Sequence, residues 1–99
     1  MKKYSMEGIG AFFLTLAVLL AFHNGAAATP PLVAGAMLMA MTYAGTSVSG
    51  AHYNPAISLI ALLRREIDRV DFPYYCLAQF AGSSLAALMA SFMLATLEM

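Results

Sequence analysis

The residues best suited to chemistry gather around one tripeptide, Asn54-Pro55-Ala56. Asparagine is a favoured helix N-cap and proline is tolerated at the first helical position, so a helix is predicted to begin directly after Asn54. The first turn of such a helix presents unpaired N–H groups and a partial positive charge. The side-chain amide of Asn54 adds two N–H donors at the same point.

The four residues before Asn54 are predicted to supply hydrogen-bond acceptors. In extended backbone, residues 50–53 would present a row of carbonyl groups without helical partners. A row of acceptors that ends at paired donors forms a path for a small hydrogen-bonding solute. The tripeptide alone is weak evidence, because it also marks an ordinary capped helix.

The rest of the chain offers little other chemistry. The single cysteine, Cys76, excludes a disulfide framework and a cysteine-based metal site. Asp and His residues form no cluster typical of catalysis, so we expect neither an enzyme nor a cofactor or metal. Hydrophobic residues make up 62% of the 99 residues and charged residues 10%, with a net charge of zero. This composition excludes nucleic-acid binding and disorder and predicts a membrane protein.

Three apolar segments are long enough to cross a bilayer. Met6–Phe22 contains Glu7 as its only charged residue and would reach about 26 Å as a helix. We therefore predict an all-α membrane protein with three transmembrane helices, at about 6–23, 31–49 and 74–97. A signal peptide over residues 1–28 is the alternative for the first span, although Glu7 and the length of its apolar run argue against it.

A fourth apolar segment, Ala56–Leu63, is too short to cross. As a helix it would cover about 12 Å, and the charged run Arg64–Asp71 follows it directly. A short segment between a polar loop and a charged run predicts a re-entrant loop and half-helix at about 50–64. Irregular backbone at membrane depth is tolerated where protein or a water-filled cavity receives its polar groups, which indicates a pore lining. The alternative is a helix that lies flat at the interface.

The basic residues all fall on one side of this topology: Lys2, Lys3, Arg64, Arg65 and Arg69. The positive-inside rule then predicts a cytoplasmic N-terminus in a plasma (inner) membrane.

Four places in the chain together resemble the aquaporin and glycerol-facilitator (major intrinsic protein) family. Ser49–Ala56 resembles its Ser-Gly-x-His-x-Asn-Pro-Ala signature, and Glu7–Phe12 its Glu-x-x-Gly-Thr-Phe pattern, with alanine in place of threonine. Tyr43-Ala44 matches the end of its second helix, and Tyr75–Gly82 resembles its Tyr-x-x-Ala-Gln-x-x-Gly pattern. Family members carry two such repeats, inverted about the membrane plane. Residues 1–99 therefore resemble a single half-repeat, a half-aquaporin.

The resemblance implies a passive channel for water and small neutral solutes, with glycerol as a candidate. Two half-length chains would form it in the lipid bilayer: an antiparallel pair of this chain, or this chain with an oppositely oriented partner. The one-sided basic residues argue against the antiparallel pair of identical chains. Other possibilities are a higher oligomer, one part of a longer protein, a small proton-coupled dual-topology transporter, and a non-conducting packing subunit.

The resemblance also implies roles for individual residues. Asn54 would donate to the solute at the pore centre, and pore-facing carbonyls would come from Gly50, Ala51 and His52. Two departures from the family pattern concern selectivity. In the family, an arginine directly follows the second Asn-Pro-Ala, and Ile57 occupies the corresponding place here. The family also commonly has an aromatic residue where this chain has Ala34. We therefore expect a wider and less polar mouth than in a strict water channel.

A second group of residues would support the loop. Pro55 and Ala56 would pack against the other half-helix, Glu7 and His52 would brace the loop, and Gln79 would bond its backbone. Each has a simpler alternative: Glu7 extending toward the cytoplasmic face, His52 satisfied within the loop, and Gln79 bonding a neighbouring helix.

Overall fold

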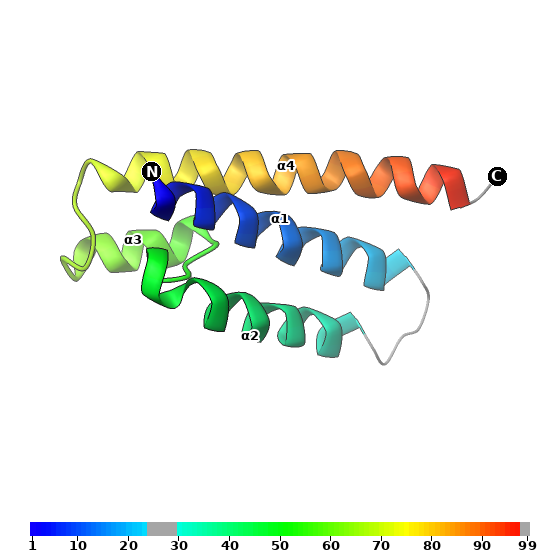
Figure 1. The fold of residues 1–99 in the computed structure, drawn as a ribbon, viewed down its shortest axis with the longest axis horizontal. Coiled ribbons are helices and arrows are strands. Elements are labelled where there is room, and N and C mark those ends of the chain that lie inside the picture. The colour runs from blue at the N-terminus through cyan, green and yellow to red at the C-terminus, as the bar shows by residue number, and fades with distance from the viewer. Residues whose placement is uncertain (24–29, 98–99) are drawn as a thin grey trace.

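The computed structural model describes residues 1–23 and 30–97, and within these segments it contains helices and no strands. Figure 1 shows the four helices in chain order. They are α1 (Lys2–His23), α2 (Pro30–Ser49), α3 (Pro55–Leu63) and α4 (Asp71–Leu97). The predicted all-α fold is confirmed for this part of the chain.

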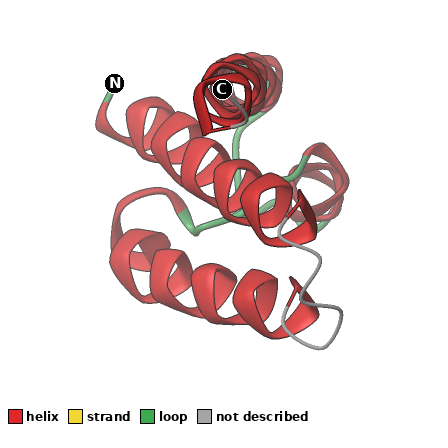
Figure 2. Ribbon diagram, turned by 90° about the vertical axis from the view of Figure 1, so that its right-hand side faces the viewer, coloured by secondary structure: helices red, strands yellow, loops and turns green. Residues whose placement is uncertain are grey.

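The three long helices lie side by side, with α1 between α2 and α4 (Figures 1 and 2). α1 and α4 run in the same direction and α2 runs in the opposite one. α3 begins close to the end of α2 and runs toward the end of the molecule where α4 begins (Figure 1). By length and composition, α1, α2 and α4 are each able to cross a membrane. The three predicted spans therefore correspond to three real helices.

The helix boundaries differ from the predicted ones at two places. α1 begins at Lys2, before the expected start near residue 6, and α4 begins at Asp71, before residue 74. Pro73 lies inside the first turn of α4, where a missing N–H costs no helical hydrogen bond. Most of the predicted connection between the first two spans, residues 24–29, lies outside the described residues.

Small residues bring α1 and α4 into close contact. A Cβ atom on Gly82 would lie 2.1 Å from the carbonyl oxygen of Gly8, so the two backbones approach as closely as glycine allows. Farther along α4, Ala86 and Ala90 are buried. The spacing of four residues places all three α4 residues on one face of the helix. Small residues at helix interfaces are the usual means of close packing in membranes.

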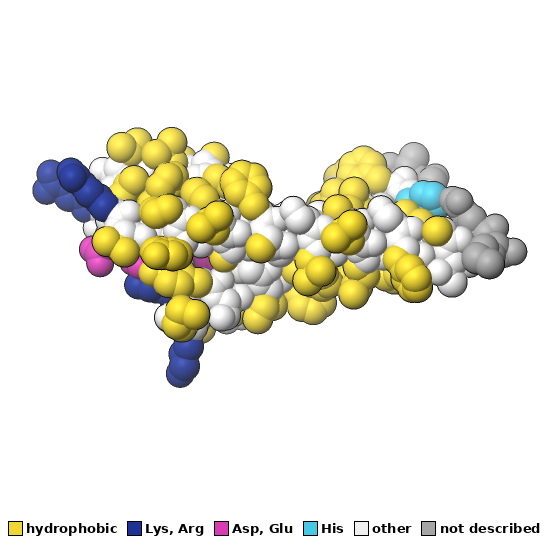
Figure 3. All heavy atoms as spheres, turned by 90° about the horizontal axis from the view of Figure 1, so that it is seen from above, with side chains coloured by type: hydrophobic (Ala, Val, Ile, Leu, Met, Phe, Trp, Pro, Cys, Tyr) yellow, Lys and Arg dark blue, Asp and Glu magenta, His cyan; other side chains and the backbone are white. Residues whose placement is uncertain are grey.

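Much of the remaining apolar surface is exposed. On α2 and α3 the exposed large side chains include Leu32, Met39, Tyr43, Ile60 and Leu63. Figure 3 shows Lys, Arg, Asp and Glu side chains gathered at the end where α3 stops and α4 starts, while apolar side chains are spread along the rest of that face. Within residues 1–23 and 30–97, the charged side chains therefore gather at one end and the flanks are apolar, as a membrane protein requires.

Candidate functional site

The site is built around the start of α3. Asn54 is the N-cap, with φ −154° and ψ 129°, and its Oδ1 accepts a hydrogen bond from the backbone N–H of Ala56 at 2.8 Å. Its carbonyl accepts from the backbone N–H of Ser58 at 3.0 Å, and Pro55 occupies the first helical turn. The predicted helix start is therefore confirmed. Asn54 is exposed, and because the cap uses Oδ1, the Nδ2 group is the part of its amide available to a solute.

The loop before Asn54 is not extended, contrary to prediction. Gly50, Ala51 and Tyr53 have φ angles of 91°, 56° and 58°, in the left-handed region. This conformation costs a non-glycine residue about 1–2 kcal/mol, so contacts outside the loop must hold it. Those contacts come mainly from α1.

Glu7 provides the main contact to the loop. Its Oε2 accepts from the Ser49 hydroxyl at 2.6 Å and from the backbone N–H of His52 at 3.0 Å. Its Oε1 accepts from the backbone N–H of Tyr53 at 2.7 Å and from Gln79 Nε2 at 2.8 Å. The side chain is fully buried, so it does not extend to the surface. Four donors match the acceptor capacity of an ionised carboxylate, which explains how a charge is tolerated there.

Gln79 connects α4 to the same cluster through side chains. Its Nε2 donates to Ser58 Oγ at 2.9 Å as well as to Glu7, and His52 Nδ1 lies 2.9 Å from the same Oγ. The predicted bond from Gln79 to the loop backbone is not formed, because Glu7 already accepts the N–H groups of His52 and Tyr53. Gln79 Oε1 is buried and has no partner among the described residues.

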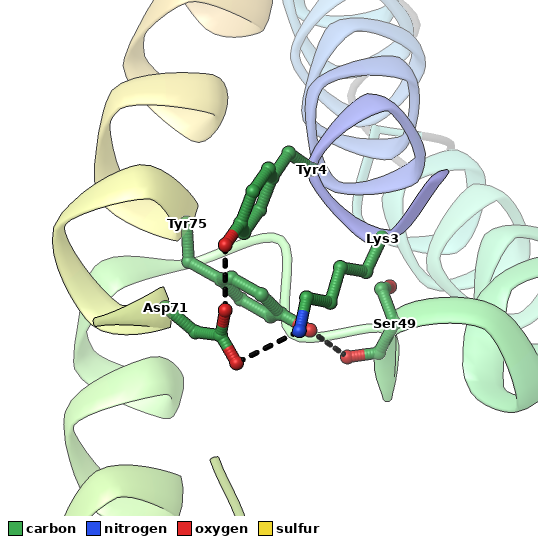
Figure 4. Close-up of polar contacts among 5 residues, drawn as sticks. All are labelled: Lys3, Tyr4, Ser49, Asp71 and Tyr75. Atoms are coloured by element: carbon green, nitrogen blue, oxygen red, sulfur yellow. Dashed lines mark hydrogen bonds and ion pairs between the residues drawn. The ribbon is translucent and has the colours of Figure 1, made fainter. Parts of the chain in front are cut away.

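A second set of polar contacts connects α1, α2 and α4 at the charged end (Figure 4). The Tyr75 hydroxyl donates to the carbonyl of Ser49 at 2.7 Å, which holds the last residue of α2 against α4. One turn earlier on α4, Asp71 accepts from the Tyr4 hydroxyl at 2.6 Å and pairs with Lys3 at 2.9 Å. The starts of α1 and α4 and the end of α2 are therefore joined beside the loop.

A cavity of about 660 Å³ lies at this end, against the loop. Three of the predicted pore residues, Gly50, His52 and Ile57, line it together with charged side chains such as Arg64. Ala34 is half-buried on α2 and does not line this cavity. Within the described ranges, no three His, Cys, Asp or Glu side chains are placed to hold a metal ion.

Several buried residues of this cluster were not among the predicted site residues. They are Ser49, Tyr53, Ser58 and Tyr75. Ser58 carried a usable signal, because it follows Asn54 by one helical turn and is polar inside an apolar helix. The sequence carried no such signal for Tyr53, because the residues around its side chain come from distant parts of the sequence.

Comparisons with known proteins agree with this geometry. The sequence profile described as "Major intrinsic protein" matches residues 3–98. The chain is 33% identical over 94 residues to "Putative aquaporin NIP4-1" of Arabidopsis thaliana, covering 88% of this chain and 33% of the relative. It is 35% identical over 91 residues to "Glycerol uptake facilitator protein-like 6" of Lactiplantibacillus plantarum, covering 88% of this chain and 41% of the relative. The chain thus spans about a third to two-fifths of these relatives. No solved structure matches significantly.

Proposed function

Because the chain belongs to the major intrinsic protein family, we propose that it forms part of a passive channel for water and small neutral solutes. Family membership and the three helices long enough to cross a membrane support an integral membrane channel rather than an enzyme. One similar protein is named an aquaporin and another a glycerol uptake facilitator, which makes water and glycerol the first solutes to test.

The observation that carries this proposal is the exposed start of α3, which is held in place through the loop before it. Asn54 caps the helix and is exposed, while Glu7 in α1 binds the loop before it from the buried side. N–H donors at this helix start would bind the solute, and the carbonyls of Gly50, Ala51 and His52 would line its path. Ile57 and Ala34 would leave the mouth wide and apolar.

A complete pore in this proposal needs a second half-length unit. We propose that α3 is re-entrant and that Pro55 and Ala56 pack against the matching half-helix of that unit. The exposed apolar side chains of α2 and α3 support such a contact. The second unit is a further copy of this chain in antiparallel orientation or an oppositely oriented partner chain. Five basic residues near the charged end favour a cytoplasmic N-terminus in a plasma membrane for the chain described here.

A proton-coupled transporter is less well supported by the same geometry. Such a transporter would use an acidic residue in the first span as its proton site. Glu7 is fully buried, and its two oxygens already accept four hydrogen bonds that hold the loop. Both oxygens of Glu7 are therefore already engaged in holding the loop.

Stopped-flow light scattering on proteoliposomes tests the channel directly. Vesicles that hold the purified chain should shrink faster in sucrose than empty vesicles and should re-swell in glycerol. Asn54→Asp keeps the side-chain size but replaces the two N–H donors, so flux should fall at equal protein incorporation. Ser91→Ala is the control, because the exposed Ser91 hydroxyl donates to the Ala87 carbonyl of its own helix and bonds no other described residue.

Each result of this test has a clear meaning. Shrinkage no faster than that of empty vesicles, with the protein inserted, would refute a channel made by this chain alone. Unchanged flux in Asn54→Asp would remove Asn54 from the solute path. A flux that requires a proton gradient would favour the transporter.

A further inference from the structure

Tyr53 places its side chain between two helices instead of along the loop. It is 5% exposed, although the residues on either side of it are less buried. A Cβ atom built on Gly10 of α1 would lie 1.9 Å from Tyr53 Cε1, and one built on Gly45 of α2 would lie 2.0 Å from its hydroxyl oxygen. The two glycines therefore leave the space that the tyrosine ring fills.

The same residue is held at both of its ends. Its backbone N–H donates to Glu7 Oε1 at 2.7 Å, and its hydroxyl donates to the Met41 carbonyl of α2 at 2.7 Å. The backbone is in the left-handed region, with φ 58°. Asn54 follows directly and starts α3. Any displacement of Tyr53 is therefore passed on to the helix start.

We propose that Tyr53 is a positioning residue: by filling the Gly10–Gly45 space, it sets where Asn54 begins α3 and so where the N–H donors stand. The effect on solute flux rests on the proposed function above. The effect on the loop itself does not, so the two can be tested separately.

A side chain at Gly10 and a side chain at Gly45 would overlap different atoms of Tyr53. A methyl group on Gly45 would overlap the hydroxyl oxygen at 2.0 Å, while the next atoms, Met6 Cγ and Tyr53 Cζ, would be 3.1 and 3.2 Å away. A methyl group on Gly10 would overlap three ring carbons, at 1.9 to 2.4 Å. Removing the hydroxyl should therefore relieve Gly45→Ala and should not relieve Gly10→Ala. General loosening of the helices would not produce this asymmetry.

Hydrogen exchange of peptides that cover residues 50–56, measured by mass spectrometry, reports on the loop without any flux. We expect exchange about tenfold faster in Gly45→Ala, because Tyr53 is displaced and the N–H bonds to Glu7 weaken. In Gly45→Ala/Tyr53→Phe, exchange should return close to that of Tyr53→Phe alone, with the contacts at 3.1 Å to Met6 Cγ and 3.2 Å to Cζ remaining tight. Gly10→Ala should remain fast with or without Tyr53→Phe. Gly35→Ala is the matched control on α2, because a Cβ atom there meets no atom within 4 Å.

Flux through proteoliposomes is then measured for the same variants. Flux that falls in Gly45→Ala and recovers with Tyr53→Phe supports the full proposal. Unchanged exchange in a folded Gly45→Ala, or no recovery in the double variant, overturns it. If the exchange pattern appears but the wild type conducts nothing, the positioning of the loop stands and the proposed function fails. If Gly10→Ala does not fold, the comparison of Gly45→Ala with Gly45→Ala/Tyr53→Phe decides whether the proposal stands.

Discussion

The interface between α1 and α4 changes character along its length. Near the loop it is polar, where Gln79 donates to the buried carboxylate of Glu7 at 2.8 Å. From Gly82 onward it consists of small residues, with Ala86 and Ala90 buried and one hydroxyl contact, Thr15 to Ser83 at 2.9 Å.

The two regions depend on different properties of their residues. A buried carboxylate needs donors of the right kind in the right places, so the polar region specifies one loop geometry. The small-residue region needs only side chains that are small enough, so it specifies how near the helices approach. Substitutions should separate these two requirements.

Glu7→Gln should have the largest effect and tests the polar region. An amide presents N–H groups to some of the four donors that now bind Glu7, and buried donors without acceptors each cost about 1–3 kcal/mol. The free energy of unfolding should fall by about 3 kcal/mol or more. Thermal unfolding followed by circular dichroism in mild detergent measures it. A Glu7→Gln protein as stable as wild type would show that the carboxylate does not organise the loop.

Gly82→Ala should have the next largest effect and tests the small-residue region. The added Cβ would lie 2.1 Å from the backbone oxygen of Gly8, which cannot move without separating the helices. We expect a loss of about 1–3 kcal/mol, the usual cost of overpacking. Gly35→Ala, where the Cβ meets open space, should instead raise the stability by up to about 1 kcal/mol through helix propensity. Equal effects of the two variants would contradict the close approach.

Thr15→Val should have a smaller effect, because the small-residue region does not depend on this hydrogen bond. Side-chain hydrogen bonds between membrane helices contribute about 0.6 kcal/mol on average. Valine keeps the shape of threonine, so the same thermal unfolding assay should show a loss of that order. A loss as large as that of Glu7→Gln would mean that both regions depend on polar contacts.

Lys3→Met should have the smallest effect and sharpens the boundary of the polar region. The Lys3 side chain is 40% exposed, so its pair with Asp71 is partly screened by solvent. The Tm should fall slightly at low ionic strength, and the difference from wild type should disappear in about 1 M salt. A salt-independent loss would show instead that the Lys3 chain contributes by packing.

Several features were predictable because they depend on neighbouring residues. The start of α3 follows from Asn54 and Pro55 alone, through capping and the fixed φ of proline. The buried face of α4 follows from small residues at a spacing of four, as at Gly82 and Ala86. The proximity of Glu7 to the loop was expected only through the family resemblance.

The contacts of the loop could not be predicted in this way. Gln79 was expected to bond the loop backbone, but Glu7, 72 positions away in the sequence, is its partner instead. Which donor meets which acceptor depends on the distances between helices, and those distances depend on packing along their whole length.

The sequence by itself determined the helices, their apolar lengths, the capped start of α3 and the charged run that follows it, because each depends on composition and short-range spacing. Only the tertiary structure decided the left-handed loop, the four donors around Glu7 and the insertion of Tyr53 between Gly10 and Gly45. The reason is physical. A strained loop and a buried charge are stable only when groups from several helices meet them together, and the meeting of those helices is not a local property.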